Sequence, residues 1–210
     1  MILYKYRALN RYTDEIIESR RLFCANWGEL NDPMEGMFEF FSSDHHDRRY
    51  LEDIIRHKNE FRVCSLSKVK YSHLLWAHYA DQFRGVLIAV DIPVPAADLV
   101  EVYYRSSHSF PVRRNWMNTE TVARRILSSK HKDWSYEKEV RILSREEYFP
   151  IPIIRHVTLG IRSSRSDDER VMWLCRDHRI PVYKLRLTDE GLEERPIDEY
   201  YRARADSEAW

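Results

Sequence analysis

The chain is poor in the residues that break, bend or cross-link a fold. Its 210 residues include only 5 glycines, 8 prolines and 3 cysteines. Low glycine and proline contents exclude collagen-like and low-complexity architectures. An odd number of widely spaced cysteines argues against a disulfide framework and for reduced thiols in a cytoplasmic protein. No apolar run reaches the roughly 20 residues that span a bilayer, and residues 1–7 lack the pattern of a signal peptide. We therefore expect a cytoplasmic protein that makes no membrane contact.

An excess of either charge is also missing, because 34 basic side chains balance 34 acidic ones. Proteins that coat nucleic acid are usually strongly basic, since their affinity comes from neutralising phosphates. A nucleic-acid contact here would need a local basic patch, for which residues 113–114, 124–125 and 130–132 are candidates. Hydrophobic residues make up 43% of the chain and aromatic residues 13%, which predicts a packed core.

Several motifs that carry chemistry are absent as well. The sequence contains no phosphate-binding glycine loop, no G-x-S-x-G nucleophile elbow and no H-E-x-x-H pair. Cys175 and His178 have the spacing of two zinc ligands, but nothing nearby supplies two more. The acidic and histidine residues at 44–47 open an expected helix, where acids favour the helix dipole. No metal site is expected.

Apolar periodicity and capping residues predict a single α+β domain over residues 1–198, followed by a C-terminal tail over 199–210. We expect mixed, mostly antiparallel sheets with flanking helices. The expected strands include residues 3–6, 61–67, 85–91, 99–104, 137–143, 155–161 and 181–187, and the expected helices include 13–20, 44–59, 72–79, one from 118 or 119, and 167–178.

Five short segments stand out in order along the chain: Leu-Tyr-Lys-Tyr-Arg at 3–7, Asn-Asp-Pro at 31–33, Trp-Ala-His-Tyr-Ala at 76–80, Trp-Ser-Tyr-Glu-Lys-Glu-Val-Arg at 134–141, and Val-Thr-Leu-Gly at 157–160. In these segments the chain resembles the bacterial family catalogued as domain of unknown function 2971. The resemblance covers nearly the whole chain. It implies no function, because the family name states none.

A second resemblance does suggest chemistry. Arg7, the Ser-Leu-Ser segment at 65–67 and the Glu-Lys-Glu segment at 137–139 are similar to the arginine, Ser-Thr-Ser and Glu-x-Glu series of ADP-ribosyltransferases. Leu66 departs from this series, where threonine is usual. The resemblance implies an ADP-ribosyltransferase-like fold and NAD as the substrate.

The resemblance assigns the catalytic roles to two glutamates. Glu139 corresponds to the second glutamate of the pair, which stabilises the oxocarbenium character of the ribose through its 2′-hydroxyl. Glu137 corresponds to the first, which orients or activates the acceptor. On one strand, both carboxylates would point to the same face. A solvated strand face with Arg141 as ion-pair partner is the alternative interpretation.

Six further residues are expected to bind NAD. Arg7 would hold a phosphate or ribose with its planar donor fork, and Ser65 would position the nicotinamide ribose, with Ser67 close by. Tyr79 or Tyr136 would stack on the nicotinamide, and His78 is a further candidate. Four of them also have a structural interpretation: a surface ion pair for Arg7, edge-strand residues for Ser65 and Ser67, and a core histidine for His78.

The leading hypothesis is therefore an NAD-dependent ADP-ribosyltransferase of the toxin or phage-defence type, or an NAD glycohydrolase if water is the acceptor. Its partners would be a macromolecular acceptor, nucleic acid or protein, and an antitoxin or inhibitor protein. One alternative is a metal-dependent nuclease that uses Asp91, Asp133, Glu137 and Glu139. The other is a nucleotide-binding module without catalysis.

Overall fold

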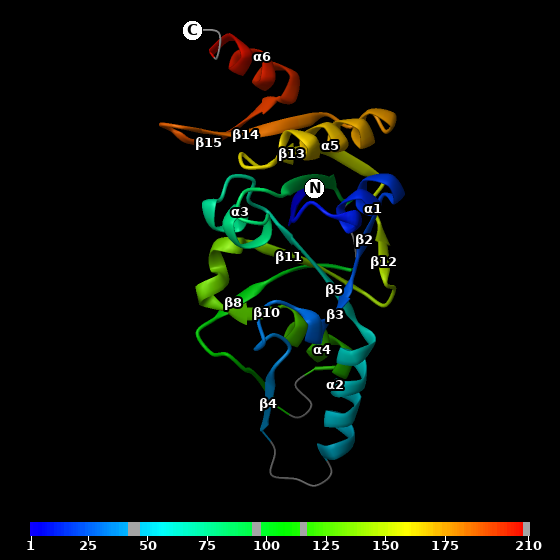
Figure 1. Ribbon diagram of the computed structural model, residues 1–210. Coiled ribbons are helices and arrows are strands. Elements are labelled where there is room, and N and C mark those ends of the chain that lie inside the picture. Colours follow the sequence, from blue (N-terminus) through cyan, green and yellow to red (C-terminus); the bar gives the residue numbers. More distant parts are fainter. Residues whose placement is uncertain (42–46, 94–97, 114–116, 208–210) are drawn as a thin grey trace. The chain divides into compact units, whose positions relative to one another are not determined.

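The computed structural model describes residues 1–41, 47–93, 98–113 and 117–207 of this mixed α/β protein, whose strands are mostly antiparallel (Figure 1). The chain forms two compact units. The first consists of Met1–Arg21, Ser67–Val94 and Pro150–Trp210, and the second of Leu22–Leu66 and Pro95–Phe149. Within the described residues, no helix is both long enough and apolar enough to cross a membrane.

The first unit is built on a sheet with the strand order β15-β14-β13-β6-β1. β1 runs antiparallel to β6, β6 to β13, and β14 to β15, whereas β13 and β14 are parallel. A parallel pair needs a crossover connection, and helix α5 supplies it. The strands are β1 (Ile2–Arg7), β6 (Val86–Asp91), β13 (Ile153–Leu159), β14 (Val182–Thr188) and β15 (Gly191–Pro196).

The helices of the first unit are α1 (Arg11–Ser19), α3 (His73–Tyr79), α5 (Arg165–Asp177) and α6 (Ile197–Ser207). Asn10 caps α1, because its side chain accepts hydrogen bonds from the amides of Tyr12 and Thr13. The helix expected over 13–20 therefore begins two residues earlier, at Arg11. The hydroxyl of Thr13 donates to the carbonyl of Ala8. α6 covers most of the segment that the sequence suggests as a tail.

Two glycines let backbone segments of the first unit approach each other closely. A Cβ atom on Gly85 would lie 2.1 Å from the carbonyl oxygen of Arg7, and one on Gly160 would lie 2.0 Å from that of Phe83. The amide of Gly160 donates to the carbonyl of Gly85 at 2.8 Å. Any side chain at either position would push these segments apart.

In the second unit the strands β5, β11 and β7 pair in this order, and β3 pairs with β5. Two parallel pairs, β8 with β10 and β4 with β9, form separate two-stranded sheets in the same unit. The strands are β3 (Ala25–Asn26), β4 (Phe38–Phe41), β5 (Arg62–Ser67), β7 (Leu99–Glu101), β8 (Tyr103–Arg105), β9 (Phe110–Arg113), β10 (Ser129–His131) and β11 (Glu139–Ser144). The paired strands β2 (Arg21–Phe23) and β12 (Tyr148–Pro150) mostly belong to this unit.

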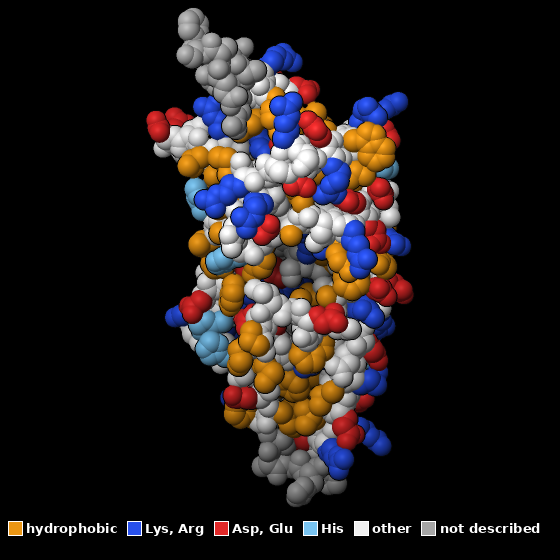
Figure 2. Space-filling view, viewed as in Figure 1, with side chains coloured by type: hydrophobic (Ala, Val, Ile, Leu, Met, Phe, Trp, Pro, Cys, Tyr) orange, Lys and Arg blue, Asp and Glu red, His pale blue; other side chains and the backbone are white. Residues whose placement is uncertain are grey.

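Two helices, α2 (Arg48–Glu60) and α4 (Thr119–Leu127), pack against one another in the second unit, which also has the 3₁₀ helices η1 (Trp27–Glu29) and η3 (Lys132–Glu137). Their shared core is formed by Ile54, Phe110, Val112, Val122 and Ile126. Figure 2 shows hydrophobic side chains gathered over β4, where Phe41 is exposed.

Several elements confirm the expectations from the sequence. Ser72 caps α3 through the amide of Leu75, and Asn118 caps α4 through the amide of Thr121. Only part of the expected helix over 44–59 can be compared, because residues 42–46 lie outside the described part of the chain. The strand expected to begin at residue 137 begins at Glu139 instead.

Candidate functional site

β11 carries a run of buried side chains, from Glu139 through Ser144. Glu139 is only 5% exposed and Arg141 is fully buried. Residues two apart on a strand share a face, and the Arg141 guanidinium donates to both carboxylate oxygens of Glu139, from Nε at 2.7 Å and from Nη2 at 3.1 Å. The solvated strand face that the sequence allowed as an alternative is thus wrong.

A lysine from β10, which pairs with β8, completes the cluster. The Nζ of Lys130, on β10, donates to Glu137 at 2.6 Å and to Glu139 at 3.2 Å. Its third partner is Glu35, at 3.2 Å, and Glu35 also pairs with Arg141. We call these residues the charge cluster: Glu35, Lys130, Glu137, Glu139 and Arg141. All of them lie in the second unit.

The turn that follows Asp32 places Glu35 in the cluster. The Asp32 carboxylate accepts from the amide of Met34 at 3.0 Å, and the Asp32 carbonyl accepts from the amide of Glu35 at 3.0 Å. Gly36 then adopts a φ of 73°, a conformation that glycine reaches without strain. The ammonium of Lys58 donates to the Gly36 carbonyl at 2.9 Å. The turn is therefore anchored on both sides of Glu35.

The cluster keeps its central carboxylate ionised. Burial by itself would raise the pKa of Glu139, but the charges of Arg141 and Lys130 and hydrogen bonds from Arg141 and Ser65 outweigh burial and hold this pKa far below its usual value. Burial would likewise lower the pKa of Lys130, but the surrounding carboxylates raise it above the ordinary lysine value. Glu139 and Lys130 thus both carry their charge at neutral pH.

The hydrogen bond from Ser65 brings together two residues that the sequence analysis placed in one site. Ser65 lies on β5 and Glu139 on β11, which are neighbours in the sheet. The backbone amide of Glu139 also donates to the hydroxyl of Tyr104 at 2.8 Å. Burial, with smaller contributions from the nearby charges, raises the pKa of Tyr104 to about 12.

The sequence predicted that Glu137 and Glu139 share a strand, but only Glu139 lies on β11. Glu137 ends η3, and Lys138 follows in the left-handed conformation with φ 44°. The chain therefore turns between the two glutamates, and the two-residue strand period does not apply. Both carboxylates nevertheless reach Lys130. Tyr136, the candidate for stacking, lies in the same turn with its ring centroid 6.2 Å from that of Trp134.

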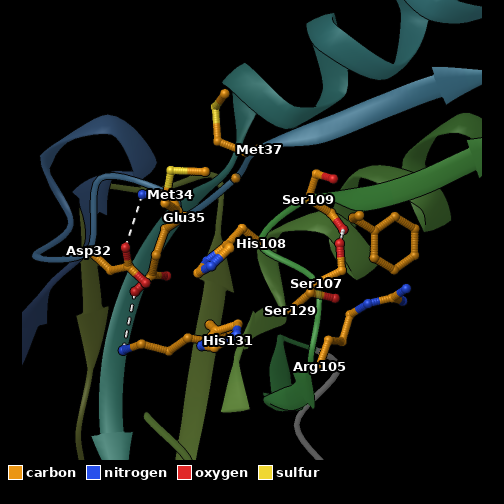
Figure 3. A pocket seen from close by; sticks show the side chains of 13 residues that line it. Asp32, Met34, Glu35, Met37, Arg105, Ser107, His108, Ser109, Ser129 and His131 are labelled. Atoms are coloured by element: carbon orange, nitrogen blue, oxygen red, sulfur yellow. Dashed lines mark hydrogen bonds and ion pairs between the residues drawn. The ribbon is translucent and has the colours of Figure 1, made fainter. Parts of the chain in front are cut away.

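A pocket opens beside the charge cluster (Figure 3). Glu35 and Lys130 form part of its wall, together with Asp32, His108 and His131. The rings of His108 and His131 stack with centroids 4.2 Å apart and planes 15° apart. The guanidinium of Arg105 lies over the ring of Phe110, 5.0 Å from its centroid. The pocket is thus lined by charged groups and imidazole rings.

The other expected NAD-binding residues belong to the first unit: Arg7, Ser67, His78 and Tyr79. Ser67 is buried, and its hydroxyl accepts from the amide of Val69 at 2.9 Å. His78 is exposed, so the core-histidine interpretation is wrong, and its ring meets that of Tyr79 edge to face. Trp76, by contrast, is fully buried. Arg7 ends β1, opposite Val86.

Sequence reasoning missed two members of the cluster. Glu35 follows the Asn-Asp-Pro turn, which the sequence analysis singled out without assigning its acid a role. Lys130 lies in a basic stretch that suggested nucleic-acid contact, yet the structure buries it among carboxylates. The neighbouring segments of the sequence could have indicated that Lys130 is buried, because an apolar helix precedes it and the pair of Glu137 and Glu139 follows it.

Comparisons with known proteins add no further information: no family model, no curated protein and no solved structure matches this chain. The resemblances drawn from the sequence therefore stay interpretations. Among the described residues, no group of three or more histidine, cysteine, aspartate or glutamate side chains is arranged to hold a metal ion. Asp91, one carboxylate of the nuclease alternative, pairs with Arg155 and with the amino terminus.

Proposed function

We propose that the protein consumes NAD in the cytoplasm, as an ADP-ribosyltransferase-like enzyme of the toxin or phage-defence type. It would transfer ADP-ribose to a nucleic acid or protein. The observation that supports this most directly is the Glu139 carboxylate, which is buried, ionised and hydrogen-bonded by Ser65. Ser65 and Glu139 are two of the residues that the resemblance to ADP-ribosyltransferases assigns to one site.

The proposed chemistry breaks the bond between ribose C1′ and the nicotinamide nitrogen. Nicotinamide leaves with the bonding electrons, and positive charge develops on the ribose. An ionised carboxylate at the 2′-hydroxyl stabilises that charge, and its benefit is large in a site with little water. Glu139 would serve in this role, because its pKa lies far below neutral pH. Glu137 would orient the acceptor group, which forms the new bond to C1′ and loses a proton.

The same contacts also stabilise the second unit, so a test must separate catalysis from folding. Glu139→Gln keeps the shape of the side chain and removes its charge. We expect this variant to lower nicotinamide release from NAD by at least about 100-fold, the scale for losing one preorganised electrostatic contact. The assay uses purified full-length protein with chelator present, alone and with added RNA, DNA or proteins from a cell lysate.

Asp168→Asn provides the matched control. Asp168 is also a fully buried carboxylate that accepts a lysine hydrogen bond, from Lys184 at 2.6 Å, but it lies in the first unit. We expect it to lower thermal stability and leave nicotinamide release per folded molecule within a few-fold of the wild type. Unchanged turnover in folded Glu139→Gln would refute the role of Glu139. NAD binding without any turnover in the wild type would favour the binding module.

A further inference from the structure

His131, which ends β10 and directly follows Lys130, faces hydrogen-bonding groups on both ring nitrogens. Its Nε2 lies 3.2 Å from the carbonyl oxygen of Ser106. Its Nδ1 accepts from the backbone amide of Asp133 at 3.4 Å and also lies 3.2 Å from the carboxylate of the same residue. The side chain is 13% exposed, and the ring of His108 covers it.

The two contacts of Nδ1 exclude each other chemically. An imidazole nitrogen accepts a hydrogen bond only with a free lone pair, and it donates to a carboxylate only when it carries a proton. Neutral His131, with its proton on Nε2, donates to Ser106 and caps the turn by accepting from the Asp133 amide. Charged His131 must give up that cap, because Nδ1–H then faces the Asp133 carboxylate.

The capped turn is η3, which carries Glu137 at its far end. The turn is closed at its base by the hydrogen bond from Lys130 to Glu137, so its two ends meet at the charge cluster. A backbone amide at the start of a helical turn needs such an acceptor. Loss of the cap would therefore loosen the segment that holds Glu137 in place.

We propose that His131 is a positioning residue whose protonation releases η3 and lowers the activity of the site. The inference rests on the proposed function, because η3 carries Glu137, which that function uses to orient the acceptor. Neutral His131 would keep the turn formed, and a proton on Nδ1 would open it.

The surrounding charges act in both directions. The Asp133 carboxylate favours the charged ring. Arg105, which is the register partner of His131 on β8, and Lys130 oppose it, and a charged His108 ring stacked on it would do the same. The ionisable groups that face His131 come from η3, β8 and its following loop, β10 and the Asp32 turn: Asp133, Arg105, His108, Lys130, Asp32 and Glu35.

Substitution at His131 separates capping from titration. Asparagine caps helical turns well and does not titrate. His131→Asn should therefore be as active as the wild type at pH 8. At pH 5.5, where the wild type loses its cap, the variant should be about fivefold more active than the wild type. His131→Ala, which cannot cap, should be about fivefold less active at both pH values. His57→Asn is the control: His57 lies on α2 of the same unit, is similarly buried and pairs with Glu60, and its variant should keep the wild-type pH profile.

A second readout does not need catalysis. Selective ¹⁵N labelling of aspartate allows the Asp133 amide to be followed by NMR as the pH falls. In the wild type this amide should shift with a transition that is absent in His131→Asn. A transition without detectable NAD turnover would uphold the switch and refute the proposed function. No transition at Asp133 that depends on His131, or equal pH profiles for the wild type and His131→Asn, would overturn the switch.

Discussion

Replacing Lys130 by methionine should destabilise the second unit strongly. Its ammonium lies within hydrogen-bonding distance of Glu137, Glu139 and Glu35, at 2.6, 3.2 and 3.2 Å, and the side chain is only 5% exposed. Methionine has a similar shape but leaves Glu35 and Glu139 with Arg141 as their remaining partner within the cluster. Removing one member of a buried ion pair costs about 3–5 kcal/mol, and we expect the free energy of unfolding to fall by this amount at pH 8.

The loss should depend on pH with a defined sign. In the wild type the folded-state pKa of Glu139 is depressed, so its contribution is present above the unfolded-state pKa of about 4.3 and lost as the pH falls below it. In Lys130→Met the Glu139 carboxylate loses a positive neighbour, so its folded-state pKa should lie above that of the wild type. The folded variant then binds a proton at a higher pH than the folded wild type, and the difference in stability should shrink as the pH falls from 8 through about 4.3.

Urea unfolding followed by circular dichroism and tryptophan fluorescence measures this difference at each pH. Arg48→Met is the control, because the Arg48–Glu52 pair is exposed on α2 and pairs of this kind contribute at most about 0.5 kcal/mol. A loss below about 1 kcal/mol for Lys130→Met at pH 8, or a loss that grows on acidification, would refute the reasoning.

A further prediction concerns the first unit. Gly85→Ala should lower the free energy of unfolding by about 1–3 kcal/mol, because its methyl group would lie 2.1 Å from the carbonyl oxygen of Arg7. Gly28→Ala, whose added methyl group meets nothing within 4 Å, should cost far less, and equal losses for the two variants would contradict this explanation.

Local signals in the sequence were enough to locate many elements. Ser72 and Asn118 begin their helices as predicted, because an N-cap acts on amides within the next three residues. α1 begins at Arg11 and not at the expected residue 13, because Asn10 is also a good N-cap and accepts from the amides of Tyr12 and Thr13. β15 was not foreseen, because three consecutive charged residues, Glu193 to Arg195, leave the strand without apolar periodicity.

The sequence by itself determined the α+β composition, the principal strands and the segments that carry Ser65, Glu137 and Glu139. Their chemistry depends on tertiary contacts between distant residues. Lys130 reads as one member of a basic surface stretch until β10 buries it against Glu137 and Glu139. Glu35 joins them only because the Asp32 turn folds back over the cluster. Charge pairing acts through space, so composition gave the number of charges while the fold decided which of them are buried together and stay ionised.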